Sequence, residues 1–246
     1  MPKSFVAFAA LACLSLSALA DPVTLQSPAN RVNLLELYTS EGCSSCPPAD
    51  RWLSGLKGDA RLWKQVVPVA FHVDYWDDIG WPDRFASAAY GNRQRHYAQT
   101  WGTSSVYTPG IVLDGKEWRS WFSRPDLKAP LGPEVGSLTL SIDGQQAAAT
   151  FATKTQLPER LELNLALLGF GLSTQVKAGE NSGRTLDHDF VVLGHKQMVL
   201  TRASNGSYRG EITLPEAHVA APRKGLAAWV SVPGDPRPIQ AVGGWL

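Results

Sequence analysis

The sequence is poor in cysteine and methionine, with three and two respectively among 246 residues, and it has no excess of charge of either sign. Lys and Arg total 23 against 22 Asp and Glu, so the charge balance predicts neither nucleic-acid binding nor a strongly charged partner. A composition of 44% hydrophobic and 18% charged residues excludes a wholly disordered chain. The length corresponds to one or two domains with a sizeable core.

Apolar runs long enough to cross a membrane are also lacking. The N-terminus instead has Lys3, a shorter apolar stretch over residues 5–19 and a small-x-small sequence at residues 18–20. This pattern predicts a secretory signal peptide over residues 1–20, cleaved after Ala20. A lipoprotein acylated at Cys13 is the alternative. We therefore expect a periplasmic or secreted protein with no membrane anchor in the mature chain.

Cleavage would remove Cys13 and leave one pair, Cys43-Ser44-Ser45-Cys46. Two nearby cysteines in an oxidising compartment can form a disulfide. This pair follows an apolar strand pattern and precedes a helix pattern, which is the context in which C-x-x-C indicates a redox pair. We expect Cys43 to be the exposed attacking thiol and Cys46 the resolving thiol.

The first half of the chain alternates between strand and helix patterns. Apolar, β-prone segments and helical periodicity predict the order β-α-β-α-β-β. The expected elements are a strand at 32–38, a helix at 47–56, a strand at 66–73, a helix at 83–99, a strand at 107–115 and its return at 116–122.

A dense group of prolines and glycines over residues 124–136 predicts a domain junction. Beyond it, short strands separated by turn signals predict a β-sandwich without helices. The predicted domains are thus residues 30–130 and 134–246. The expected strands of the second are 138–142, 146–151, 161–168, 190–201, 208–214 and 225–232.

Two other roles for the cysteine pair stay open, a structural disulfide and part of a metal site. A bridge closing a four-residue ring gains little loop entropy, which argues against a structural role. Attachment of a c-type haem would require histidine at Pro47, and structural zinc would require a second ligand pair that the sequence lacks. Copper would combine both cysteines with His72 and Met198. We expect no cofactor.

A strand, the C-x-x-C pair, a helix and a later Thr108-Pro109 that opens a strand together resemble the thioredoxin fold. Four segments are more closely similar to an uncharacterised family of secreted thioredoxin-like proteins, a "domain of unknown function" group. The resemblance implies an α/β plus β fold, a thioredoxin-like domain followed by a β-sandwich-like domain, and a redox site, but no substrate. The segments are Ser40–Asp50, His72–Asp77, Tyr107–Pro109 and Gly183–Leu186.

The resemblance also assigns roles to single residues. Pro109 is the expected cis-proline opposite the redox pair, and with Thr108 it would offer backbone groups to an extended substrate. Glu36 is the nearest candidate for the buried acid that thioredoxins place beneath the pair. Counted from Cys43 it is one residue out of position, and in a strand one residue changes the face. Gly42 departs from the tryptophan usual before the first cysteine.

The segment Asp74-Tyr75-Trp76-Asp77 follows the second expected strand, at the sheet edge that also carries the cysteines. It is predicted to form a substrate-contacting wall or lid, with aromatic packing at a domain interface as the alternative. Arg93 and Arg95 are expected on a solvated helix face. Residues 179–185 are interpreted as a long turn or a partner-binding loop.

The sequence thus predicts an exported thiol–disulfide oxidoreductase that acts on protein thiols or disulfides together with an unidentified redox partner. Two alternatives remain. The first is a non-enzymatic, partner-binding protein in which Cys43 and Cys46 form a fixed bridge. The second is a copper-handling or other metal-handling protein.

Overall fold

The computed structural model of the chain describes residues 22–123 and 126–246. The predicted signal peptide and Cys13 lie outside the described residues. Strands account for 42% of the described residues and helices for 14%. In the described ranges no helix is both long and apolar enough to cross a membrane.

The N-terminal half contains both α-helices. Its elements in chain order are β1 (Val23–Gln26), β2 (Asn33–Thr39), α1 (Pro47–Gly55), a 3₁₀ turn (Leu56–Gly58), β3 (Val66–His72), a 3₁₀ turn (Asp77–Ile79), α2 (Ala88–Thr100), β4 (Gly110–Leu113), β5 (Lys116–Glu117) and a 3₁₀ turn (Arg119–Phe122).

The C-terminal half consists of strands and loops in its described residues. Its strands are β6 (Ser137–Asp143), β7 (Gln146–Ala152), β8 (Arg160–Phe170), β9 (Leu172–Gln175), β10 (Thr185–His188), β11 (Val191–Arg202), β12 (Tyr208–Thr213), β13 (Arg223–Ser231) and β14 (Gln240–Trp245).

Local sequence explains where the two helices begin. The tandem prolines Pro47 and Pro48 occupy the first turn of α1, where a missing N–H leaves no helical bond unmade. The second helix begins at Ala88 rather than at residue 83, because Ser87 caps it. The Ser87 hydroxyl accepts a hydrogen bond from the Ala89 N–H at 3.3 Å.

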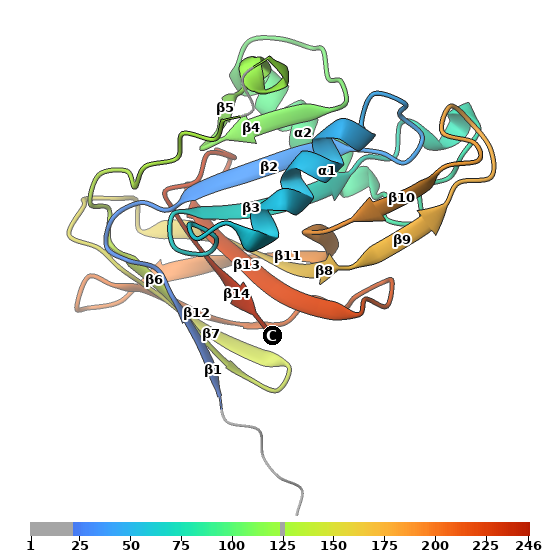
Figure 1. Cartoon of the computed structure of the whole chain (residues 1–246). Coiled ribbons are helices and arrows are strands. Elements are labelled where there is room, and N and C mark those ends of the chain that lie inside the picture. Colours follow the sequence, from blue (N-terminus) through green and yellow to red (C-terminus); the bar gives the residue numbers. More distant parts are fainter. Residues whose placement is uncertain (1–21, 124–125) are drawn as a thin grey trace, which may run out of the picture.

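The predicted fold class, a thioredoxin-like α/β domain followed by a separate β-sandwich, is wrong. Twelve strands from both halves form one continuous mixed sheet (Figure 1), and β9 and β10 form a separate hairpin. The main path of the twelve-stranded sheet is β1-β6-β7-β12-β11-β3-β2-β4-β5. A branch leaves this path at β11, where β8 pairs with β11, β13 pairs with β8, and β14 pairs with β13.

Two strand pairings join the halves in one sheet. In the first, β1 pairs antiparallel with β6. In the second, the first residue of β11 pairs in parallel with Ala70 of β3, and the last residues of β11 pair antiparallel with β12. The same strand also pairs with β8 from Val191 to Thr201. An isolated N-terminal half would leave the β3 edge with unpaired backbone groups, and β11 satisfies them. The periodicity of a strand does not reveal which edge it will join.

The largest hydrophobic core is also shared between the halves. It contains Leu34, Val69 and Phe71 together with Phe190 and Trp229. The Phe71 and Trp229 rings meet edge to face with centroids 6.4 Å apart. Helix α1 lies over β2 and β3 in Figure 1, and it packs against β10. The cysteine pair therefore lies next to both halves of the chain.

Candidate functional site

Cys43 and Cys46 form a disulfide at the junction between β2 and α1, with Cα atoms 5.5 Å apart. Cys46 is the N-cap residue of α1, and its carbonyl accepts the Ala49 N–H at 2.8 Å. Both cysteines are completely buried, which differs from the expected exposure of Cys43. Ser44 and Ser45 between them are exposed. Access to either sulfur thus depends on the segments packed around this turn.

Trp76 lies beside the cysteine turn and contacts Thr108. The Trp76 indole N–H donates to the Thr108 hydroxyl at 2.8 Å, and the Thr108-Pro109 peptide bond is cis. A Cβ placed on Gly42 would lie 3.1 Å from the Trp76 Cβ, so glycine at this position leaves room for the tryptophan. Trp76 thus connects Gly42, which precedes Cys43, with Thr108, which precedes the cis-proline Pro109.

The loop between β9 and β10 contacts the same turn from the C-terminal half. The Asn181 side-chain amide is fully buried and donates to the carbonyls of Glu41 and Cys43, both at 2.9 Å. The Glu180 carboxylate accepts the Ser44 N–H at 3.0 Å. Residues 177–184, called here the β9–β10 loop, thus hold the backbone of the cysteine turn on both sides of Cys43.

Beneath the turn lies a group of five titratable side chains, each at most 6% exposed. His72 Nδ1 lies 2.6 Å from Asp83 Oδ2, and the same oxygen accepts the Glu41 N–H at 2.8 Å. His188 Nε2 lies 3.3 Å from Glu41 Oε1, and its Nδ1 lies 4.0 Å from Asp50 Oδ2. We call Glu41, Asp50, His72, Asp83 and His188 the buried acid–histidine cluster.

Charge pairing and burial oppose each other in this cluster. Burial disfavours the ions of His72 and Asp83, but their mutual attraction outweighs it, so the pKa of His72 is raised and that of Asp83 is lowered. Burial dominates at Asp50 and raises its pKa, against the opposing effect of the two histidines. Asp50 is therefore the member of the cluster that is poised to hold a proton above the usual range of an aspartate.

The cluster has an opening toward solvent between α1 and β10. A cavity of about 70 Å³ is lined by Asp50 and His188 together with Arg51 and Asp187. Such a volume accommodates water molecules. His72 Nε2 and His188 Nδ1 have no hydrogen-bond partner among the described residues, so water entering here would find polar atoms to bind.

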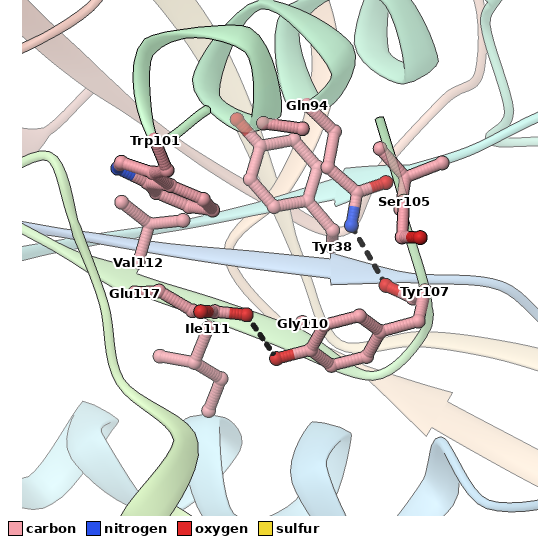
Figure 2. A pocket seen from close by; sticks show the side chains of 11 residues that line it. Tyr38, Gln94, Trp101, Ser105, Tyr107, Gly110, Ile111, Val112 and Glu117 are labelled. Carbon is pink, nitrogen blue, oxygen red and sulfur yellow. Dashed lines mark hydrogen bonds between the residues drawn. The ribbon is translucent and has the colours of Figure 1, made fainter. Parts of the chain in front are cut away.

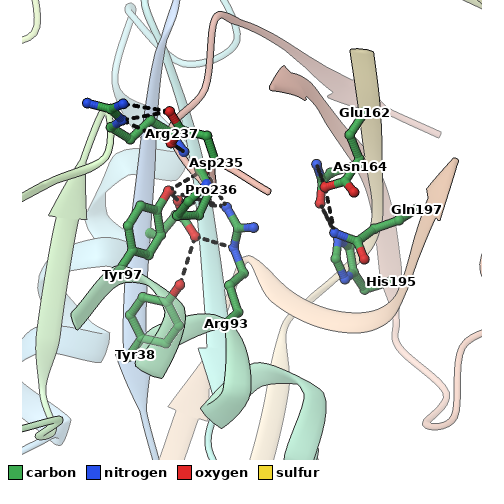
Figure 3. A network of polar contacts seen from close by, with 11 residues as sticks. Tyr38, Arg93, Tyr97, Glu162, Asn164, His195, Gln197, Asp235, Pro236 and Arg237 are labelled. Carbon is green, nitrogen blue, oxygen red and sulfur yellow. Dashed lines mark hydrogen bonds and ion pairs between the residues drawn. The ribbon is translucent and has the colours of Figure 1, made fainter. Parts of the chain in front are cut away.

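Glu36 does not belong to this site, and its predicted role as the acid beneath the disulfide is a misplacement. It bonds to Arg93 of α2 at 2.7 and 3.1 Å and accepts the hydroxyls of Tyr97 and Tyr38 at 2.6 and 2.9 Å. Figure 3 shows Arg93, Tyr97 and Tyr38 converging on this network. Residues 36 and 38 point to one face of β2, whereas Thr39 and its neighbour His72 point to the other. Arg93 is consequently buried rather than solvated.

The other residues predicted to line the site diverge from the sulfurs. The Tyr75 hydroxyl donates to Gln94 of α2 at 3.1 Å, and burial raises its pKa to about 12. Asp77 accepts the Asp83 N–H at 3.0 Å. Asp74 lies against Gly91, also in α2. Trp76 lies against Gly42 of the turn, and both Tyr75 and Trp76 interact with Thr108 in the loop that carries Pro109.

Figure 2 shows a pocket behind that loop, between α2 and β4. Gln94 donates to the Tyr107 carbonyl at 2.7 Å across it, and the Tyr107 hydroxyl donates to Glu117 at 2.6 Å. Its volume is about 20 Å³, far below the several hundred Å³ that a small-molecule site occupies. Two larger hollows, of about 590 and 650 Å³, are lined by none of the predicted site residues.

Sequence reasoning missed Asp50, Asp83, His188 and Asn181. The sequence indicated Asp50 only as an acidic residue in the first turn of a helix. Asp83, His188 and Asn181 lie far along the chain from the cysteines. Within the described residues no group of three or more His, Cys, Asp or Glu is arranged to hold a metal ion. Met198, the methionine in the copper hypothesis, packs with the C-terminal core.

Similar folds occur in two solved structures. A crystal structure of a protein from Agrobacterium tumefaciens is 23% identical, with a TM-score of 0.59, and the match covers 87% of this chain and 94% of that one. HBP35 of Porphyromonas gingivalis is 16% identical, also with a TM-score of 0.59, over 89% of this chain and 76% of that one. Curated proteins give no match.

One protein family matches most of the chain. The match extends over residues 34–231 and thus includes the cysteine pair, the cis Thr108-Pro109 bond, the β9–β10 loop and every member of the buried acid–histidine cluster. The chain therefore belongs to the family described as proteins of unknown function, DUF1223.

Proposed function

We propose that the protein is an exported thiol–disulfide oxidoreductase that acts on protein thiols or disulfides. The observation that carries this proposal is a buried Cys43–Cys46 disulfide flanked in the chain by Glu41 and Asp50, two members of the buried acid–histidine cluster. A four-residue ring contributes little to stability, and five buried titratable groups are costly to fold. Such costs concentrate where side chains carry out chemistry.

The reaction exchanges one disulfide for another. In the reducing direction the Cys43 thiolate attacks a client disulfide, so that a Cys43–client bond forms while the client S–S bond breaks and one client thiolate leaves. The Cys46 thiolate then attacks Cys43, which restores the Cys43–Cys46 bond and releases the second client thiolate. Two electrons pass from the pair to the client. In the oxidising direction each step runs backwards, and a separate redox protein resets the pair.

Each exchange also moves protons, and Asp50 is placed to take part. It lies four residues after Cys46 on α1, and this spacing puts the two side chains on the same helix face. Its raised pKa makes proton uptake from the Cys46 thiol less unfavourable than for an exposed aspartate. The cavity beside Asp50 and His188 offers a route for the proton to solvent.

Mixed-disulfide trapping tests the proposal. Expressed without residues 1–20, a Cys46→Ser variant has Cys43 as its single thiol. We expect it to form a covalent, dithiothreitol-sensitive adduct with a denatured protein that contains disulfides. The Cys43→Ser/Cys46→Ser double variant is the matched control and should form none. Absence of an adduct between Cys46→Ser and the disulfide-containing client would refute the enzymatic function.

Complete burial of both cysteines favours the second candidate, a partner-binding protein with a fixed bridge. The reduction potential separates the two functions. Structural disulfides have reduction potentials below about −300 mV, whereas the redox pairs of thiol–disulfide oxidoreductases have reduction potentials from about −120 to −270 mV. Equilibrating the protein in dithiol buffers of graded potential gives this value directly, and we expect it within the oxidoreductase range.

A further inference from the structure

The β9–β10 loop meets the cysteine turn with two side chains whose functions differ. Glu180 is exposed and bears a charge, whereas Asn181 is fully buried and neutral. The loop is anchored behind them, since a Cβ at Gly80 would lie 3.2 Å from the Gly179 Cα. Gly179 and Gly183 on either side have φ values of 73° and 81°, which glycine adopts without strain.

We propose that Glu180 and Asn181 are positioning residues that set the reactivity of Cys43. Asn181 holds the turn in its closed form, and Glu180 places a negative charge where a Cys43 thiolate would develop. The inference rests on the proposed redox function, and it assigns control of the cysteine pair in the N-terminal half to a hairpin of the C-terminal half.

The role of Glu180 follows from its partner. The Ser44 N–H, directly after Cys43, is a backbone donor of the cysteine turn, and a hydrogen bond from such a donor would favour a thiolate at Cys43. Glu180 occupies this donor at 3.0 Å and adds a charge of the same sign as the thiolate. The hydrogen bond from Ser44 lowers the pKa of Glu180, so the carboxylate is ionised at neutral pH. Both effects disfavour the attacking form of Cys43.

The role of Asn181 follows from its complete hydrogen bonding. Its amide nitrogen donates to the carbonyls on both sides of Gly42, and its oxygen accepts from Arg184 at 2.6 Å. Arg184 thereby fixes the orientation of the amide. Removing the side chain takes away the donor to the Glu41 carbonyl and leaves the Cys43 carbonyl with the Cys46 N–H as its donor, while the loop loses both hydrogen bonds to the turn. The closed turn, in which Cys43 has no exposed surface, then opens more readily.

The other titratable and charged side chains around the cysteine turn are the same in all the variants used below. They are the members of the buried acid–histidine cluster and Arg184: Glu41 from the turn itself, Asp50 from α1, His72 from β3, Asp83 from the loop after β3, His188 from β10, and Arg184 from the β9–β10 loop.

A single-charge variant tests the electrostatic role. In the Cys46→Ser background, Glu180→Gln should lower the pKa of the Cys43 thiol by about half a unit to one unit, an amount that shrinks as salt is added. The measurement is ultraviolet thiolate absorbance against pH. Glu211→Gln, which removes an exposed negative charge from β12 rather than from the β9–β10 loop, should leave that pKa unchanged. Equal pKa values in Glu180→Gln and its parent would overturn the assignment.

A rate measurement tests Asn181. In the protein with both cysteines, Asn181→Ala should raise the rate of disulfide reduction by dithiothreitol about tenfold, because two hydrogen bonds no longer hold the turn closed. Asn164→Ala is the control, since it removes an equally buried asparagine that bonds to His195 in the strand layer. It lowers stability without changing the reduction rate. A reduction rate for Asn181→Ala equal to that of the wild type would contradict the proposed role of Asn181 in holding the turn closed.

These measurements need no client, so they separate this inference from the proposed function. A shifted pKa and a faster reduction without any client adduct would sustain the control of Cys43 and refute the oxidoreductase. Client adducts with unshifted pKa and rate would sustain the oxidoreductase and refute the roles of Glu180 and Asn181.

Discussion

Single residues in this protein are sorted by which face of a strand they occupy. On one face of β2 and β3, Glu36 and Arg93 form a buried ion pair with two tyrosine hydroxyls. On the other face, His72 lies in the buried acid–histidine cluster. One residue of register separates a group that supports the fold from a group that lies under the disulfide.

The first prediction concerns the ion pair. Glu36→Gln leaves the Arg93 guanidinium buried without its counter-charge, which should lower the free energy of unfolding by about 3–5 kcal/mol. The reduction potential of the cysteine pair should stay at the wild-type value, because Glu36 faces α2. Urea denaturation and redox equilibration measure the two quantities.

Glu159→Gln provides the comparison, since Glu159 pairs with Arg202 at the surface, where Glu159 is 79% exposed. It should change the free energy of unfolding by no more than about 1 kcal/mol. If Glu36→Gln shifts the reduction potential more than Glu159→Gln does, Glu36 acts on the cysteine pair after all.

Residue types and spacing identified the cysteine pair, which forms a disulfide, and the thioredoxin resemblance predicted the cis peptide bond at Thr108-Pro109. They did not identify His188 or Asn181, because these reach the site through pairing between distant strands. Glu36 was misassigned because a strand pattern indicates burial on both faces without saying which face meets which helix.

At the scale of elements, β11 combines two kinds of pairing. It is parallel to β3 at Val191 and antiparallel to β8, with an irregularity in the register between Val192 and Gly194. A bulge of this kind bends a strand and increases its twist. The bend lets one strand serve both branches of the sheet.

Gly194→Ala tests this element. A Cβ at position 194 would overlap the carbonyl oxygen of Glu216, so the backbone must move and the free energy of unfolding should fall by about 1–3 kcal/mol. Gly58→Ala has open space around the added methyl group and should be neutral or slightly stabilising. A wild-type unfolding midpoint for Gly194→Ala would show that β11 does not need this close approach.

Most strands and both helices were predictable from periodicity and caps, including β2, α1 and β3. The hairpin β9–β10 was not, because its strands have four residues each and its loop carries polar residues typical of any turn. The last strand, β14, contains two glycines in six residues and lacks the β-branched pattern of a strand.

At the scale of the whole molecule, the shared sheet implies shared stability. A fragment of residues 22–132 would lose the partner of the β3 edge and the contribution of Phe190, Ala227 and Trp229 to the core. We expect this fragment to lack fixed tertiary structure in near-ultraviolet circular dichroism, and the full chain to unfold in one calorimetric transition. A folded, protease-resistant fragment would instead support the domain boundaries expected from sequence, 30–130 and 134–246.

Composition and hydrophobic pattern indicated a globular chain with an α/β half and a β half, and the order of elements followed. The prolines and glycines at residues 124–136 predicted two separate domains. Whether the halves form one sheet depends instead on which strand edges have unpaired backbone groups. That property belongs to the assembled sheet and cannot be deduced from one strand at a time.

The side chain of Gln240 has a consequence for the order in which the protein acquires its structure. It accepts the Val32 N–H at 2.9 Å and donates to the carbonyls of Asn30 and Gly136 at 3.2 and 2.7 Å. Ribosomes add about 5–20 residues per second, and Gln240 lies 208 positions after Val32. Gln240 is therefore synthesised roughly 10–40 s after Val32. The cysteines, made early, therefore remain in a chain without this contact until residue 240 has been added.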